Sequence, residues 1–388
     1  MAKSKAKVNG DAPKVVVPVT KKIPTPSPKA VLAIVPTPTI GDAILVGEPI
    51  YYLPPDERQP EMSLRADKFF ELAESRDWGH GPLGLEAVHA KGHMGKNVLI
   101  AIADTGIDVG HPDLKDRIRP VGNKDFTNSP SGFMDQQGHG SHCAGIAAAS
   151  ANGAGLIGAA PDAHLIAVKV LNDQGSGASS WIAAGIRYAA DQGVDIISLS
   201  LGGPSADPNT RSAIQYAISK GCWVVCAAGN DGRETNNYPG HYAESIAVAA
   251  LDNQSKRASF STINVENDVA APGVSIMSTL PDNRYGQMSG TSMATPYVAG
   301  CLACLRGAYK AANKHPCTQQ ELNAAIKQYS KDIPPEGTDK WTGGGLLDVG
   351  KLIEKLVGSS PAPPTPPTPP PGSDVVLKAG EKVTVRAA

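Results

Sequence analysis

Proline is concentrated at the two ends of this chain, and that distribution limits where a folded domain can lie. Eleven of the 33 prolines fall within residues 1–60 and eight within residues 359–372. Because proline lacks the backbone donor that helices and central strands need, both ends are expected to be extended. We therefore predict a leader at residues 1–75, one globular domain at 76–358, a linker at 359–373 and a short tail at 374–388.

Composition narrows the classes of function. Hydrophobic residues make up 41% of the chain, enough for the middle to bury a large core. The 36 basic and 37 acidic residues balance, and aromatic residues are only 5%, which argues against a nucleic-acid partner. Nowhere do about 18 apolar residues run together, so no membrane span is expected. The first thirty residues carry seven lysines with no apolar segment after them, so we expect no secretory signal and a cytoplasmic location.

Six cysteines are an even number, but their spacing argues against a disulfide framework. Cys222 and Cys226 flank three apolar residues of an expected strand, which would separate them by about 13 Å. Cys301 and Cys304 fall on one face of an expected helix. Two interpretations stay open for these four residues, buried thiols or a zinc site. Unpaired thiols fit a reducing compartment.

Apolar runs alternate with helical stretches along the middle of the chain. Strands are expected at residues 97–104, 165–170, 195–201, 223–228 and 245–250, and helices at 138–149, 179–192, 209–220 and 292–311. This alternation predicts an α/β protein with a mostly parallel sheet covered on both faces. Functional groups in such sheets gather at the carboxyl ends of strands, where Asp104, Gly202 and Asn230 stand.

Three short segments each place a reactive side chain among small residues. They are Asp104-Thr-Gly, Gly138-His-Gly-Ser-His-Cys and Gly290-Thr-Ser-Met-Ala-Thr-Pro. Taken alone, each has a structural interpretation, as a strand-end cap, a surface histidine or a helix cap. Together they supply a carboxylate, an imidazole and a hydroxyl, the groups that activate a serine nucleophile.

The order Asp104, His139, Ser292 and the residues around each of them resemble the subtilases, the serine peptidases of the subtilisin family. The resemblance runs from about Trp78 to about Leu356. It implies a three-layer fold with a mostly parallel central sheet between helices. It also implies that Ser292 is the nucleophile, that His139 is its base and that Asp104 orients the histidine. We therefore expect a serine endopeptidase of broad specificity that forms an acyl-enzyme.

The resemblance also implies where a polypeptide substrate lies. Asn230 would donate to the oxyanion; the other interpretation of this residue is a turn residue after Gly229. An extended substrate would pair with two segments of backbone, and its side chain before the cleaved bond would enter a pocket walled by small residues. A charge at the pocket rim, Asp231, adds the hypothesis that lysine or arginine is accepted there. The residues expected to contact substrate are Gly175, Ser176, Gly177, Ser200, Leu201, Gly202, Ala228, Gly229 and Asp231.

Calcium is the cofactor that the resemblance implies, as a structural ion. The matching ligands are the side chains of Asp113 and Asn152 and the carbonyls of Ser150, Ala154 and Leu156, a set of hard oxygens. The alternative is a glycine-rich turn capped by Asp113. Separately, Cys143 is similar to the cysteine beneath the histidine of thiol-bearing subtilases, which implies inhibition by mercurials.

Residues 1–75 resemble the short leaders of intracellular subtilisins, which implies synthesis as a zymogen. Residues 48–55, Glu-Pro-Ile-Tyr-Tyr-Leu-Pro-Pro, are a candidate plug that would inhibit the enzyme by lying in its own cleft. The other interpretation of this leader is a linker. Two further functions are weighed for the whole chain. One is a peptide ligase or macrocyclase, for which no inserted lid is evident, and the other is a catalytically silent peptide-binding protein.

Overall fold

A computed structural model describes residues 50–52, 62–65 and 74–358 of the chain. Seven parallel strands of these residues form a central sheet in the order β10-β9-β8-β7-β3-β5-β4. They are β3 (Leu99–Asp104), β4 (Lys124–Asp125), β5 (His164–Lys169), β7 (Ile196–Leu199), β8 (Trp223–Ala227), β9 (Ile246–Leu251) and β10 (Asn267–Pro272). All five strands expected from the apolar runs are present, whereas β4 and β10 were not predicted.

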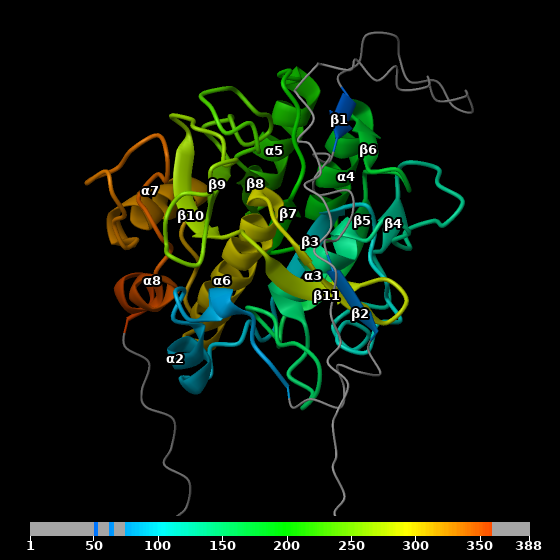
Figure 1. Cartoon of the computed structure of the whole chain (residues 1–388), viewed down its shortest axis with the longest axis horizontal. Coiled ribbons are helices and arrows are strands. Elements are labelled where there is room, and N and C mark those ends of the chain that lie inside the picture. The colour runs from blue at the N-terminus through cyan, green and yellow to red at the C-terminus, as the bar shows by residue number, and fades with distance from the viewer. Residues whose placement is uncertain (1–49, 53–61, 66–73, 359–388) are drawn as a thin grey trace, which may run out of the picture. The chain divides into compact units, whose positions relative to one another are not determined.

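Both faces of the sheet are covered by helices (Figure 1). On β3, Ile100 and Ile102 belong to the core shared with α3 (His139–Ala148) and α6 (Thr291–Ala311). The alternate residues, Ala101 and Ala103, belong to the core shared with α4 (Ser179–Asp191) and α5 (Pro208–Ser219). Because successive side chains of a strand point to opposite faces, a strand buried on both sides has a continuous apolar sequence. The predicted three-layer α/β fold is confirmed.

The order of strands reverses beside β3. The chain passes from β3 to β5 on one side, then returns to place β7 on the other side, and continues outward through β8, β9 and β10. Ligands of parallel sheets bind at the carboxyl ends of strands next to such a reversal. Asp104 ends β3, and Ser200 directly follows β7. The topology therefore brings residues from distant parts of the chain to one edge.

Two short strands of the leader pair with the globular domain. β1 (Ile50–Tyr52) runs antiparallel to β6 (Ser176–Ala178), with Tyr51 opposite Gly177. β2 (Met62–Arg65) runs antiparallel to β12 (Arg284–Met288), which also pairs with β11 (Ile276–Leu280). The remaining elements are η2 (Trp78–His80), α2 (Leu85–Ala90), α7 (Gln319–Tyr329) and α8 (Val349–Leu356). The other plug residues, the predicted linker and the tail lie outside the described residues.

The two pairs of cysteines lie on opposite sides of the sheet. Cys222 and Cys226 belong to the core on the side of α4 and α5, whereas Cys301 and Cys304 belong to the core on the side of α6. A zinc site made of these four is therefore wrong, and all four are buried free thiols.

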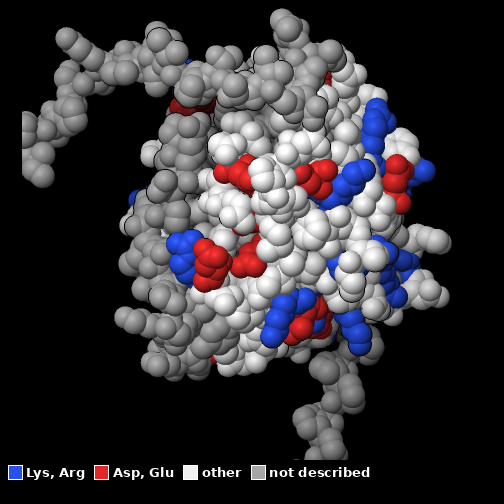
Figure 2. Space-filling model, turned by 90° about the vertical axis from the view of Figure 1, so that its right-hand side faces the viewer, with Lys and Arg blue, Asp and Glu red and all other residues white. Residues whose placement is uncertain are grey.

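Two predictions drawn from the composition concern the surface and the helices: no nucleic-acid partner and no membrane span. On the face seen in Figure 2, lysine and arginine are interspersed with aspartate and glutamate, so its described residues form no continuous basic surface. In the part of the chain that the structure describes, no helix has the length and apolar character needed to cross a bilayer.

Candidate active site

Asp104 and His139 form a buried hydrogen-bonded pair where β3 ends and α3 begins. His139 Nδ1 lies 2.8 Å from Asp104 Oδ1 and 3.0 Å from Oδ2, and both residues are fully buried. The Thr105 amide donates to Asp104 Oδ1 at 2.7 Å and so holds the carboxylate in place. A side chain at Gly140 would collide with the Gly106 carbonyl, so glycine is needed for α3 to approach the strand end this closely.

The surroundings of His139 favour its protonated form. Burial lowers the pKa of His139, but the Asp104 carboxylate and Cys143 outweigh burial, so the pKa lies well above its usual value. His142 behaves oppositely, because burial and the charge of His139 lower its pKa to about 3. Burial raises the pKa of Cys143 to about 11, so this cysteine is a neutral thiol at physiological pH.

Ser292 is the second residue of α6 and lies beside Cys143 and Ser200. Its carbonyl oxygen accepts from Ser200 Oγ at 3.0 Å and from Cys143 Sγ at 3.5 Å, and its own Oγ donates to the Ser200 carbonyl at 3.3 Å. Cys143 Sγ also lies 3.8 Å from His139 Nδ1. The thiol therefore bridges the histidine and the serine segment, and the fold brings together residues that are 153 positions apart.

Asn230 follows β8 at the same edge of the sheet. Its Oδ1 accepts from the Thr291 amide at 2.9 Å and from Thr291 Oγ1 at 3.0 Å. These two bonds fix the side-chain amide with its oxygen toward the residue next to Ser292 and its nitrogen turned away from that residue. The structure thus places Asn230 beside the start of α6 rather than in an isolated turn.

The segment predicted to bind substrate on one side is already paired with the leader. β1 occupies the edge of β6, which holds Ser176 and Gly177. Tyr51 of β1 is fully buried in the core cluster that contains Leu201, another predicted substrate contact. Burial raises the pKa of Tyr51, and Tyr242 and Asp207 add to this increase.

The predicted walls of the specificity pocket follow two neighbouring strands, β7 and β8. Asn237, which sequence reasoning missed, packs against both Gly202 and Gly229, since a side chain at either glycine would collide with it. Asp231 is exposed, and one of its carboxylate oxygens accepts from Thr235 Oγ1 at 2.7 Å. Its charge therefore lies at the surface but is partly engaged by that hydroxyl.

The loop at residues 150–156 surrounds the fully buried Asp113, as the predicted calcium ligands require. The Asp113 carboxylate accepts from Asn152 Nδ2 at 3.0 Å, from the Leu156 amide at 2.9 Å and from the Tyr285 hydroxyl at 2.8 Å. Gly155 packs against this carboxylate with a φ of +65°, where a side chain would collide with it. The contact with Tyr285 could not be predicted from the sequence, because Tyr285 is 172 positions away from Asp113.

The remaining oxygens test whether this loop suits a calcium ion. No described residue donates a hydrogen bond to the carbonyls of Ser150, Ala154 or Leu156, and carbonyl oxygens are ligands that suit a hard cation. Asn152 is turned the other way, because its Oδ1 accepts from the Ala154 amide at 3.0 Å. The donor set fits calcium once the amide of Asn152 rotates to bring its oxygen toward Asp113.

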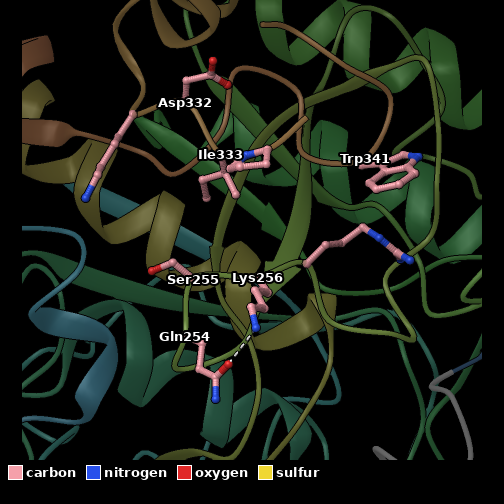
Figure 3. Close-up of a pocket in the computed structure, with 9 residues that line it drawn as sticks. Gln254, Ser255, Lys256, Asp332, Ile333 and Trp341 are labelled. Atoms are coloured by element: carbon pink, nitrogen blue, oxygen red, sulfur yellow. Dashed lines mark hydrogen bonds between the residues drawn. The ribbon is translucent and has the colours of Figure 1, made fainter. Parts of the chain in front are cut away.

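A separate hollow of about 560 Å³ lies away from these residues (Figure 3). Two loops line it, residues 254–257 and 331–334, together with Trp341. In Figure 3, the Lys256 ammonium points toward Gln254, to whose Oε1 it donates at 2.9 Å. None of the predicted catalytic or substrate-binding residues lines this hollow.

Sequence reasoning also missed Asp135, a buried carboxylate at the start of α3. It accepts from the amides of Gly138 and Ser141 at 2.9 and 2.8 Å. A signal was present, since an acidic residue four positions before His139 is suitably placed to cap the helix that the histidine begins.

Known proteins match this chain over the whole region that carries the site. The model of the Subtilase family matches residues 95–345. An intracellular serine protease of Paenibacillus polymyxa is 43% identical over 69% of this chain and 84% of its own length. The major intracellular serine protease of Bacillus subtilis is 42% identical, covering 66% and 83%, and thermitase of Thermoactinomyces vulgaris is 44% identical, covering 67% and 90%. This chain belongs to the subtilase family.

Proposed function

We propose that this chain is a serine endopeptidase whose triad is Ser292, His139 and Asp104. The observation that carries the proposal is the buried pair of hydrogen bonds, 2.8 and 3.0 Å, from His139 Nδ1 to the Asp104 carboxylate. With Nδ1 bound to the carboxylate, Nε2 is the ring nitrogen that takes the serine proton.

The reaction proceeds in two displacements. Ser292 Oγ bonds to the carbonyl carbon of the substrate as its proton passes to His139, and Asp104 stabilises the imidazolium that results. His139 then gives this proton to the leaving amine, the peptide C–N bond breaks, and an acyl-enzyme remains. Water hydrolyses the acyl-enzyme by the same steps. The Ser292 amide and Asn230 Nδ2 donate to the oxyanion.

Labelling with a fluorophosphonate tests the proposed nucleophile. We expect the probe to modify Ser292, as located by peptide mass spectrometry, and the same preparation to hydrolyse casein, whereas Ser292→Ala does neither. Labelling without hydrolysis would favour the ligase, and new peptide bonds formed from an added amine would identify it. A chain that binds peptides but is not labelled is the silent binding protein, and the proposal is then wrong.

We propose that the leader inhibits the enzyme until it is removed. β1 occupies the β6 edge, and β2 pairs with β12, which ends shortly before Ser292. The leader thus pairs both with a segment predicted to bind substrate and with a strand that precedes Ser292. His139 is 0% and Ser292 2% exposed, and on this proposal a protein substrate reaches them only after the leader has left. Mass spectrometry of the mature N-terminus, with the activity of a chain lacking residues 1–60, tests this role; unchanged initial activity would contradict it.

Broad specificity follows from recognition of substrate backbone by the edges of β6 and the segment after β7. We propose that the pocket between Gly202 and Gly229 takes large apolar side chains and that the exposed Asp231 also admits lysine or arginine. A peptide library varied at the residue before the cleaved bond tests this. If peptides with lysine and with its neutral isostere at this position are cleaved at equal rates, Asp231 does not contribute to specificity.

We propose that the loop around Asp113 binds one structural calcium ion. The ion would be held by Asp113 and Asn152 and by the carbonyls of Ser150, Ala154 and Leu156. Its charge would tie this loop to the Asp113 segment, and it takes no part in the reaction. Calorimetric titration of the chelator-treated chain with Ca²⁺ tests the assignment.

We propose that the enzyme acts on polypeptides inside the cell. Two of its relatives are named intracellular serine proteases, and its cysteines are free thiols. Cell fractionation with an antibody to the chain tests the location. Recovery of the active form only from culture medium would contradict it.

A further inference from the structure

Thr105 and Asp135 connect the strand that ends in Asp104 to the helix that begins with His139. Thr105 Oγ1 donates to Asp135 Oδ1 and accepts from the Gly140 amide, each at 2.9 Å. The Thr105 hydroxyl is therefore used both as a donor and as an acceptor. Both residues are buried, since Thr105 is fully buried and Asp135 is 1% exposed.

Asp135 supplies the helix cap that the residue at the cap position cannot. α3 begins after Gly138, which has no side chain to bind the first amides. Asp135 Oδ1 accepts from Gln137 and Gly138, at 3.0 and 2.9 Å, and Oδ2 accepts from Ser141 at 2.8 Å. Burial raises the pKa of Asp135, whereas the hydrogen bonds from Gly138, Ser141 and Thr105 oppose this increase. All the partners of its carboxylate are donors at the positive end of a helix, which is how an ionised carboxylate binds.

Lys169 also connects the end of β3 to the segment that contains Asp135. Its fully buried ammonium donates to the Thr105 carbonyl at 2.6 Å, to the Met134 carbonyl at 3.1 Å and to Asp173 at 2.7 Å. The strand end is thus joined to residues 134–135 by two bridges, one from the Thr105 hydroxyl to Asp135 and one through Lys169 to the Met134 carbonyl. The Asp104–His139 contact closes a ring of hydrogen bonds that runs through Thr105 and Gly140.

We propose that Asp135 and Thr105 are positioning residues, which set the distance and orientation between Asp104 and His139. The proposal rests on the proposed triad, because it gives these two residues a part in the same reaction. It assigns to Asp135 a second effect, since its negative charge favours the imidazolium form of His139. The titratable groups that face His139 directly are Asp104 from β3 and Cys143 and His142 from α3.

Two substitutions of Thr105 separate positioning from mere packing. Thr105→Val keeps the shape but removes the hydroxyl, whereas Thr105→Ser keeps the hydroxyl. Rates are expressed per site titrated with the fluorophosphonate, so that misfolded protein is not counted. We expect kcat to fall about ten- to hundred-fold in the valine variant with KM changed less than twofold, since displacing a catalytic group by about 1 Å costs this much. The serine variant should stay within about threefold of wild type.

Asp135→Asn tests the charge. We expect a similar loss in kcat and a shift of the acid limb of the kcat/KM profile to lower pH, because removing an anion lowers the pKa of His139. Combining it with Thr105→Val should cost little beyond the worse single change, since both break one bridge. The control is Asp268→Asn, another buried carboxylate, on β10 at the edge of the sheet; it should lower the melting temperature without moving the pH profile.

The outcomes are distinct. A valine variant with the kcat and pH profile of wild type overturns the positioning role, and so do fully additive losses in the double variant. If Asp135→Asn does not fold, the valine and serine pair decides the question. In a Ser292→Ala background, proton NMR of the His139 Nδ1 hydrogen should show this signal altered by Thr105→Val and unchanged by Thr105→Ser. A wild-type chain that is neither labelled nor active overturns the proposed function instead.

Discussion

Replacing Tyr51 by alanine in the full chain should release the active site from its leader. Tyr51 is 0% exposed, and β1 holds it against the globular domain through its pairing with β6. Only a bulky side chain is lost in Tyr51→Ala, because the backbone pairing with Gly177 does not depend on it. The change therefore weakens the proposed inhibitory contact without touching any triad residue.

The expected size of the effect follows from this burial. An aromatic side chain buries about 150 Å² or more, which at about 25 cal/mol per Å² is worth about 4 kcal/mol. Alanine retains a part of this, so we estimate a loss of about 3 kcal/mol. Since about 1.4 kcal/mol corresponds to a factor of ten, the open fraction should increase about 150-fold.

The assay is the initial rate at which a fluorophosphonate labels Ser292 in chains that mass spectrometry shows to be unprocessed. This rate is proportional to the fraction of molecules with an open site, and later self-cleavage does not enter it. Tyr51→Phe is the matched control, which keeps the ring and should label no faster than wild type. If the alanine variant also labels at the wild-type rate, Tyr51 does not close the site and the argument from burial is refuted.

Four further predictions concern the site itself. Asn230→Ala should lower kcat by about 10²–10³ with little change in KM, which is the known cost of removing the equivalent oxyanion donor from a subtilisin. The pKa of His139 is raised, and only a neutral imidazole accepts the serine proton, so kcat/KM should increase as the pH rises through that pKa. A profile that is half-maximal below pH about 6.5, the usual pKa of histidine, would show that the pKa is not raised. One equivalent of mercuric ion should inhibit the wild type but not Cys143→Ala, since the thiol lies 3.8 Å from His139 Nδ1. Excess Ca²⁺ should raise the melting temperature above that in chelator, and Asp113→Asn should abolish the difference.

Much of the fold was predictable because the strands are buried on both faces. Such strands have continuous apolar sequences, so all five were found, whereas β4 has only two residues and β10 begins with Asn267 and Asp268. All four predicted helices begin within one residue of the prediction, because caps and glycines mark their starts. The order of strands in the sheet was not predictable, since it depends on pairing between segments far apart in the sequence.

The sequence by itself determined the residues of the proposed triad and the family, because each reactive side chain stands in a short local motif. Only the tertiary structure decided which groups touch. It placed the two cysteine pairs on opposite faces, put Tyr51 against the β6 edge, turned the amide of Asn152 and joined Thr105 to Asp135. The physical reason is that hydrogen bonds and close packing act over a few ångströms. Residues separated by tens or hundreds of positions come this close only when the whole chain has folded into one topology.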